Sequence, residues 1–293
     1  MDSHTGADRR YAPQPEILPP GPLPGSQERP QHRGWYPPPQ PPPRPARRRH
    51  WASAPATYTL VGINFAVFLF TLYQSQSLAG PDFRTDSLSF KLLCNGGLVL
   101  LAGQWWRVVT SIFVHFGWIH IASNMWCLWN LGLLGEPLLG EFGIIAAYLL
   151  TGIAGNLLSI AFNPTLYGQP GGILSAGASG AVFGLAGVLL MLLRSPLLPI
   201  PQFELKKLRR SVWYFALLNF VIDAGLWVAH TAIQIDNMAH LGGFLSGIAL
   251  GYPLLPRIGA NRSDFARRRA ITVGAMAFLL VLIAWGLRAA YTG

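Results

Sequence analysis

The sequence predicts an all-α protein, a bundle of helices that crosses a membrane several times. Of its 293 residues, 51% are hydrophobic and 12% are charged, whereas a soluble domain carries about 25% charged residues. Seven apolar stretches approach the ~20 residues that a helix needs to cross ~30 Å of hydrocarbon. Apolar and polar residues do not alternate along them, as they would in a membrane barrel, so each is predicted to be a helix. The stretches are residues 56–75, 117–135, 143–162, 178–193, 211–229, 237–254 and 270–289.

Residues 1–50 precede the first stretch and hold 14 of the 24 prolines. A segment so rich in proline and so poor in aliphatic residues cannot bury a core, which predicts a disordered tail rich in Pro and Arg. A cleaved secretory signal would place an apolar run directly after a short basic start, and here the long polar tail comes first. We therefore expect the tail to stay attached.

Lys and Arg residues fall mainly on one side of the predicted topology. Eighteen of the 22 lie in the tail, in the 194–210 loop and in the 257–269 loop. Connections rich in Lys and Arg stay in the cytoplasm. The amino terminus is therefore predicted to be cytoplasmic and segment 76–116 to be a structured outer loop. Because the basic residues form short clusters between apolar runs, a nucleic-acid partner is not expected.

Polar side chains inside membrane stretches are costly and are functional candidates by default. His120, Ser179 and His240 lie near the outer ends of the second, fourth and sixth stretches, at a common depth. Fifteen residues run from Ser179 to the residue before Arg194, about 22 Å of helix, which places Ser179 roughly 8 Å below the outer surface. The preceding segment, 168–177, must then dip inward and line a wet cavity.

Small residues at helical spacing stand beside both Ser179 and His240, and such stripes let two helix backbones approach closely. A hydroxyl and an imidazole on closely packed helices can come within hydrogen-bonding reach, as a base-activated serine requires. His120 and Asn124, four residues apart, project from one helix face and could hold an oxyanion together with backbone N–H groups. The stripes are Gly180 and Gly184 in the fourth stretch, and Ala239, Gly243 and Gly247 in the sixth.

Through these residues the sequence resembles the rhomboid family of intramembrane serine proteases, over about residues 56–255. The main matches are Gly177-Ala178-Ser179-Gly180 (GxSG), Ala239-His240-Leu241-Gly242-Gly243 with Gly247 (AHxxGxxxG), and His120 with Asn124 (HxxxN). Lesser matches are Trp106-Arg107, and Gly132, Glu136 and Gly140 (GxxxExxxG); we interpret Glu136 and Trp106-Arg107 as stabilising the fold.

The resemblance implies a six-span catalytic core over residues 51–255. Residues 256–293 would then be a cytoplasmic linker and a seventh transmembrane helix, and residues 1–50 a cytoplasmic tail. It also implies an intramembrane serine endopeptidase that uses a Ser-His dyad, without cofactor or metal, on single-pass transmembrane substrates near the outer face of the bilayer. The implied roles are Ser179 as nucleophile, His240 as base, His120 and Asn124 as oxyanion donors, and Phe183 as the ring that packs on the histidine.

The same residues also allow structural roles, a metal centre or the active-site turn of a soluble hydrolase. A serine at a helix start is more often an N-cap, and a lone membrane histidine can bond a carbonyl. A metal centre at His115, His120 and His240 is disfavoured because there is no HExxH motif and no carboxylate within one turn of His120. Ala181 stands where the GxSxG elbow of soluble hydrolases needs glycine.

Two rival functions stand beside the protease, and the presence of both dyad residues together with the oxyanion donors favours the enzyme over them. A non-catalytic relative would bind membrane helices, although such proteins usually lack the serine or the histidine. A transporter would predict broken helices in inverted repeats, which the sequence does not show. Asp236, one turn before His240, is the candidate for a triad carboxylate, but a dyad is expected; the role of Asp223 is left open. The composition favours a bacterial plasma (inner) membrane, with organellar membranes as the alternative.

Overall fold

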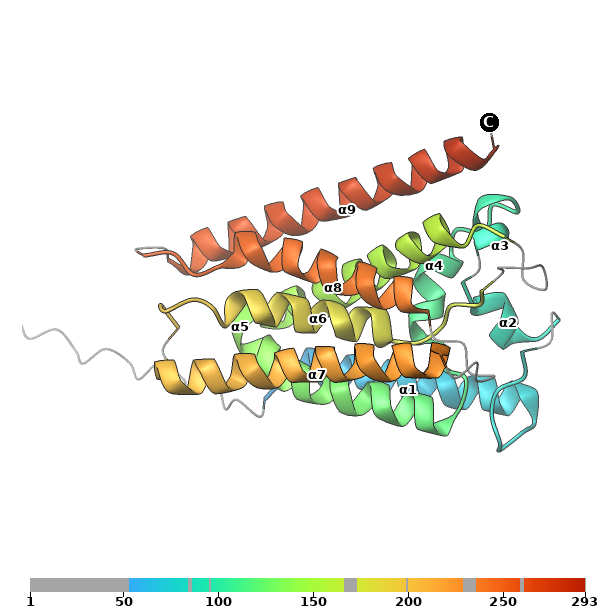
Figure 1. Cartoon of the computed structure of the whole chain (residues 1–293), viewed down its shortest axis with the longest axis horizontal. Helices are drawn as coiled ribbons and strands as arrows, with labels where there is room; N and C mark the ends of the chain where they lie inside the picture. Colours follow the sequence, from blue (N-terminus) through green and yellow to red (C-terminus); the bar gives the residue numbers. More distant parts are fainter. Residues whose placement is uncertain are drawn as a thin grey trace, which may run out of the picture. The chain divides into compact units, whose positions relative to one another are not determined.

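The computed structural model describes residues 53–83, 86–94, 96–165, 173–198, 200–228, 236–258 and 261–292. The predicted tail lies outside these residues. The described part is built from helices, which confirms the all-α class (Figure 1). The long helices are α1 (Pro55–Ser75), α5 (Trp118–Phe162), α6 (Ser179–Leu192), α7 (Gln202–Val228), α8 (Asn237–Gly251) and α9 (Arg262–Thr292). The short ones are α2 (Leu88–Leu92), α3 (Gly96–Leu100), α4 (Arg107–Thr110), η1 (Ser111–Phe113) and η2 (Tyr252–Leu254).

Each of the seven predicted stretches falls on a helix, and the second and third share α5. This helix of 45 residues is broken at Gly140, whose φ of 76° and ψ of 167° lie outside the helical region. Glycine adopts a positive φ at little cost, so the break falls there. By length and composition, α1, α5 and residues Arg262–Tyr291 of α9 are long and apolar enough to cross a bilayer, and α6 is apolar but shorter.

Helix α6 occupies the centre of the bundle, packed against α5 and α8 (Figure 1). Eleven of its fourteen residues are buried. A helix that is apolar on all sides is typical of such a fully enclosed position. Ser179, the first residue of α6, is thereby held inside the bundle.

Helix α1 is fastened to the first half of α5 by the buried carboxylate of Glu136. Its two oxygens accept hydrogen bonds from the backbone N–H groups of Ala56 (3.0 Å) and Thr57 (2.7 Å) and from the Thr57 hydroxyl (2.7 Å). The first N–H groups of a helix have no partner within it, so an acceptor from another helix satisfies them. One turn before Glu136, Gly132 leaves room for the Thr57 side chain.

The segment between α1 and α5 is a structured loop, as expected from the sequence. The guanidinium of Arg107 is buried and donates to the carbonyls of Phe90 and Leu93. Cys94 pairs with Ser175 through two backbone hydrogen bonds of 2.9 and 2.7 Å. The loop is thereby joined to the chain that leads into α6.

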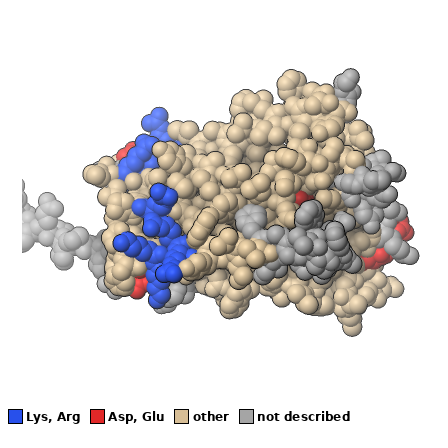
Figure 2. Space-filling view, in the orientation of Figure 1, with Lys and Arg blue, Asp and Glu red and all other residues tan. Residues whose placement is uncertain are grey.

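Two neighbouring arginines near the start of α9 donate hydrogen bonds to the rest of the bundle, which α9 also contacts through apolar side chains such as Leu280. Arg269 donates to the carbonyl of Leu139, where the first half of α5 ends, and Arg268 donates to the carbonyls of Pro253 (3.1 Å) and Leu255 (3.0 Å). Cations stabilise the carboxyl ends of helices, where carbonyl groups lack partners. Figure 2 shows Lys and Arg gathered at the end where α7 and α9 begin.

Candidate active site

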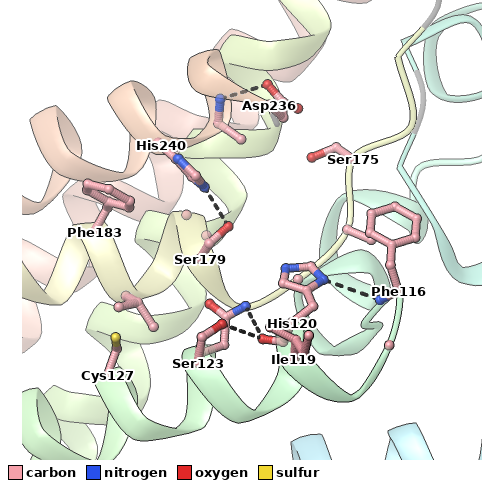
Figure 3. Close-up of a pocket in the computed structure, with 18 of the residues that line it drawn as sticks. Phe116, Ile119, His120, Ser123, Cys127, Ser175, Ser179, Phe183, Asp236 and His240 are labelled. Atoms are coloured by element: carbon pink, nitrogen blue, oxygen red, sulfur yellow. Dashed lines mark hydrogen bonds between the residues drawn. The ribbon is translucent and has the colours of Figure 1, made fainter. Parts of the chain in front are cut away.

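Ser179 and His240, sixty-one residues apart in the chain, meet between α6 and α8. The Nε2 atom of His240 lies 2.7 Å from the Oγ atom of Ser179 (Figure 3). Ser179 is the first residue of α6, and His240 stands in the first turn of α8. This distance is within the 2.6–3.2 Å range that a general base needs.

The close approach of α6 and α8 depends on glycines. A Cβ atom on Gly243 would overlap the carbonyl of Gly180, and one on Gly247 would overlap the carbonyl of Gly184. The two predicted stripes therefore meet. The side of Gly184 that would carry a Cβ faces Thr151 of α5, so this glycine serves the packing of α5 against α6.

The imidazole of His240 is stacked on the ring of Phe183, one helical turn after Ser179. The ring centroids are 4.5 Å apart and the planes are inclined by 24°. His240 itself is buried. The stacking limits rotation of the imidazole, so its Nε2 atom stays directed at the serine.

The turn before Ser179 is held by η1 and by the loop that follows it. Gly177 has a φ of 112°, which other residues rarely adopt. Its N–H donates to the carbonyl of Ser111 (2.9 Å), and the N–H of Ala178 donates to Nε2 of His115 (3.4 Å). Burial, and secondarily the neighbouring His120, lowers the pKa of His115 well below its usual range. The ring therefore stays neutral and can accept this bond. From the sequence, His115 was a candidate only for a metal ligand.

His120 and Asn124 of α5 line the same cavity as Ser179. Nδ1 of His120 accepts from the N–H of Phe116 (3.2 Å), so the proton of the neutral ring is on Nε2. That Nε2 atom lies against the Cα of Gly177. The amide of Asn124 donates to the carbonyl of His120 (3.0 Å). Both side chains stand beside the turn that leads into Ser179.

One cavity of about 700 Å³ is lined by all four predicted site residues, Ser179, His240, His120 and Asn124. Leu174 to Gly177 form part of its wall, which agrees with the expectation that the chain before Ser179 dips inward; residues 168–172 of that segment lie outside the described residues. Further wall residues come from α5, α6 and α7, among them Ser123, Cys127, Val182 and Phe215.

A buried amide joins the wall of the cavity to the segment between α1 and α5. Asn156 of α5 donates to the carbonyl of Val108 (2.8 Å) and to the hydroxyl of Ser111 (2.9 Å), and it accepts from the hydroxyl of Ser175 (3.2 Å). Asn156 was not among the residues predicted from the sequence. A polar residue inside the predicted third stretch was the available signal, because such residues need partners in lipid.

Asp236 caps α8 and has a second partner in α5. One carboxylate oxygen accepts from the N–H of Ala239 (3.0 Å), and the other accepts from the hydroxyl of Ser159. The side chain of Asp223 lies outside the described residues. Within the described ranges, no group of three or more His, Cys, Asp or Glu side chains is placed to hold a metal ion.

Fold and site together define a multi-pass membrane protein with a serine–histidine pair in an internal cavity. Comparison with known proteins agrees with that class. The model of the Rhomboid domain matches residues 102–257, just over half of the chain. The chain belongs to the rhomboid family.

Curated relatives come from bacteria, plants and a parasite. The chain is 30% identical to "Rhomboid protease GluP" of Bacillus subtilis (strain 168), over 79% of this chain and 41% of the relative. It is 33% identical to "RHOMBOID-like protein 5" of Arabidopsis thaliana, over 53% of this chain and 46% of the relative. It is 28% identical to "Rhomboid-like protease 5" of Toxoplasma gondii, over 55% of this chain and 17% of the relative. The chain thus spans less than half the length of each of these three.

Proposed function

We propose that this protein is an intramembrane serine endopeptidase in which Ser179 is the nucleophile and His240 the general base. The 2.7 Å contact between their Oγ and Nε2 atoms is the observation that carries the proposal. In the first step Oγ attacks the scissile carbonyl carbon while Nε2 takes the hydroxyl proton. The same proton is passed to the leaving amine, and a water molecule activated by His240 then hydrolyses the acyl-enzyme.

The negative charge of the tetrahedral intermediate needs donors beside Ser179. The amino end of α6 provides backbone N–H groups and the positive end of the helix dipole. The Nε2–H of His120 stands next to Gly177, and the amide of Asn124 is one turn further along α5. To join in, the Asn124 amide has to turn from the carbonyl of His120 toward the oxyanion. Donors fixed in advance around a developing charge are a principal source of rate enhancement.

The substrates we propose are single-pass transmembrane proteins, cut near the outer face of the bilayer. Ser179 lies inside the bundle, so a peptide bond has to enter the cavity to reach it. The carbonyl groups of an intact helix are occupied by hydrogen bonds, so a transmembrane segment must unwind locally before attack. The basic end in Figure 2 supports a cytoplasmic amino terminus and an outward-facing site. We propose the plasma membrane of a bacterium on the composition of the sequence alone.

Reconstitution in lipid vesicles with a single-pass reporter tests the proposal. The wild-type protein is expected to cut the reporter, whereas Ser179→Ala and His240→Ala are expected to leave it intact. Ser246→Ala is the matched control, because this α8 hydroxyl bonds the carbonyl of Gly243. If folded wild-type protein bound the reporter without cutting it, the protein would be a helix-binding relative and the enzyme proposal would be wrong.

A further inference from the structure

Asp236 lies four residues before the proposed base and fixes the point where α8 begins. Its Oδ1 atom accepts from the N–H of Ala239 at 3.0 Å, which is the bond of an N-cap. An acceptor at this position satisfies one of the N–H groups that the first turn leaves without a partner. His240 follows Ala239 directly, so the capped turn is the turn that carries the imidazole.

The second oxygen of Asp236 joins this turn to α5. The hydroxyl of Ser159 donates to Oδ2, although the two residues are 77 positions apart in the chain. Ser159 is only 4% exposed. One turn earlier on the same face of α5, Gly155 lets the carbonyl of Ala239 approach its Cα. The start of α8 is therefore in direct contact with α5.

The same turn is also in contact with α6. A Cβ on Gly180 would lie 3.2 Å from the carbonyl oxygen of Ala239. Gly180 directly follows Ser179. The peptide that precedes His240 is therefore enclosed between α5 and α6, and the orientation of this turn determines the distance between the imidazole and the serine.

We propose that Asp236 and Ser159 are a positioning pair, which holds the first turn of α8 so that His240 stays in contact with Ser179. The proposal rests on the proposed function. Asp236 acts here on the helix backbone and on α5 as a hydrogen-bond acceptor, whereas a triad carboxylate would act on the imidazole through its charge. An amide in place of the carboxylate still caps α8, because asparagine is as good an N-cap as aspartate, and its NH2 group can bond the Ser159 oxygen, but it carries no charge.

Three variants of Asp236 separate these roles. Asp236→Asn keeps an oxygen that accepts from the N–H of Ala239, and its NH2 group can donate to the hydroxyl oxygen of Ser159. Asp236→Ser keeps the cap but does not reach Ser159, and Asp236→Ala keeps neither contact. Ser159→Ala removes the hydroxyl alone. We expect kcat for reporter cleavage near the wild-type value in Asp236→Asn, and lower in Asp236→Ser and Ser159→Ala. In Asp236→Ala we expect a fall of about 100-fold, since a shift of ~1 Å in reacting groups costs that much.

Two further readouts distinguish positioning from loss of structure. KM and the pH profile of kcat should stay unchanged in all four variants, and the rate of covalent labelling by a fluorophosphonate should fall in parallel with kcat. Asn261→Ala is the matched control, because Asn261 accepts from the N–H of Asp264 (2.9 Å) at the start of α9, away from the cavity. Asn261→Ala should lower the melting temperature, because α9 loses its N-cap, and should leave kcat unchanged.

A loss in Asp236→Asn as large as in Asp236→Ala, with a shifted pH profile, would show that the charge is required and would overturn the proposal in favour of a triad. Wild-type kcat in folded Asp236→Ala would overturn it as well. If the protein were not a serine protease, the result would be different. The wild-type protein would then not be labelled by the fluorophosphonate, and none of the four variants would change labelling or reporter cleavage.

Discussion

Gly243 of α8 lies directly on the backbone of Gly180 in α6, with no room for a side chain between them. The contact is one residue from Ser179 and three from His240. It lets the two helix axes approach until a short serine side chain can reach an imidazole. Backbone packing, rather than side-chain reach, thus sets the geometry of the proposed dyad.

Gly243→Leu is therefore expected to force α6 and α8 apart. Overpacking a tight contact costs about 3 kcal/mol of unfolding free energy, and the separation should also abolish reporter cleavage. Gly286→Leu, on α9, is the control, because no atom lies within 4 Å of the added Cβ. Thermal unfolding in detergent and reporter cleavage measure the two effects. Wild-type melting and activity in Gly243→Leu would refute the packing argument.

Glu136 is expected to matter for stability and not for chemistry. Its carboxylate accepts three hydrogen bonds from the start of α1, and bonds to a charged group contribute about 1.5–3 kcal/mol each. Glu136→Ala should lower the melting temperature strongly, while the folded fraction keeps its kcat. Asp86→Ala removes an exposed carboxylate from the segment between α1 and α5 and should melt like the wild type. A kcat loss in folded Glu136→Ala would contradict a purely structural role.

Arg269 is expected to anchor α9 to the rest of the bundle. Its guanidinium donates to the carbonyl of Leu139 and lies over the ring of Phe142, 5.4 Å from the centroid. Arg269→Ala should therefore lower the melting temperature, and Arg269→Lys should restore part of the loss, because lysine keeps the charge at the helix end. Arg267→Ala, an exposed neighbour, serves as the control. Equal melting of Arg269→Ala and Arg267→Ala would show that the anchor contributes nothing.

Asn124 is expected to contribute to kcat through the oxyanion. Loss of one donor costs about 100-fold or more in kcat, so Asn124→Ala should fall by about that factor with little change in KM. Asn130→Ala is the matched control and should keep the wild-type kcat. The Asn130 amide also donates to the carbonyl four residues earlier on α5 (2.7 Å), but it is exposed. A change in KM alone would assign Asn124 to substrate binding. His120→Ala should behave like Asn124→Ala.

The fold was largely predictable from the sequence because lipid imposes a simple rule on backbone polar groups. Apolar stretches of sufficient length must be helices, and each of the seven lies on one. The glycine stripes likewise indicated which helices pack closely. The break at Gly140 falls between the second and third predicted stretches, as their separation implied, but the sequence did not show that a single glycine, with no longer loop, would join the two helices.

The contacts that hold the site depend on pairs distant in sequence, and these were not predictable. The bond between Ser159 and Asp236 joins residues 77 positions apart, and that between Glu136 and Thr57 spans 79. Each residue alone has several ordinary roles, such as an N-cap or an interhelical bond. Their partners are determined only by how three helices pack together, which a single sequence does not specify.

Covalent labelling of the purified protein by a fluorophosphonate tests the central claim, a serine activated by His240, most directly. The probe reacts with an activated serine hydroxyl and needs no substrate helix, so it separates the dyad from substrate entry. We expect labelling of the wild type at Ser179, none in Ser179→Ala, and very slow labelling in His240→Ala. Labelling of folded Ser179→Ala at the wild-type rate, or wild-type labelling in His240→Ala, would contradict the account.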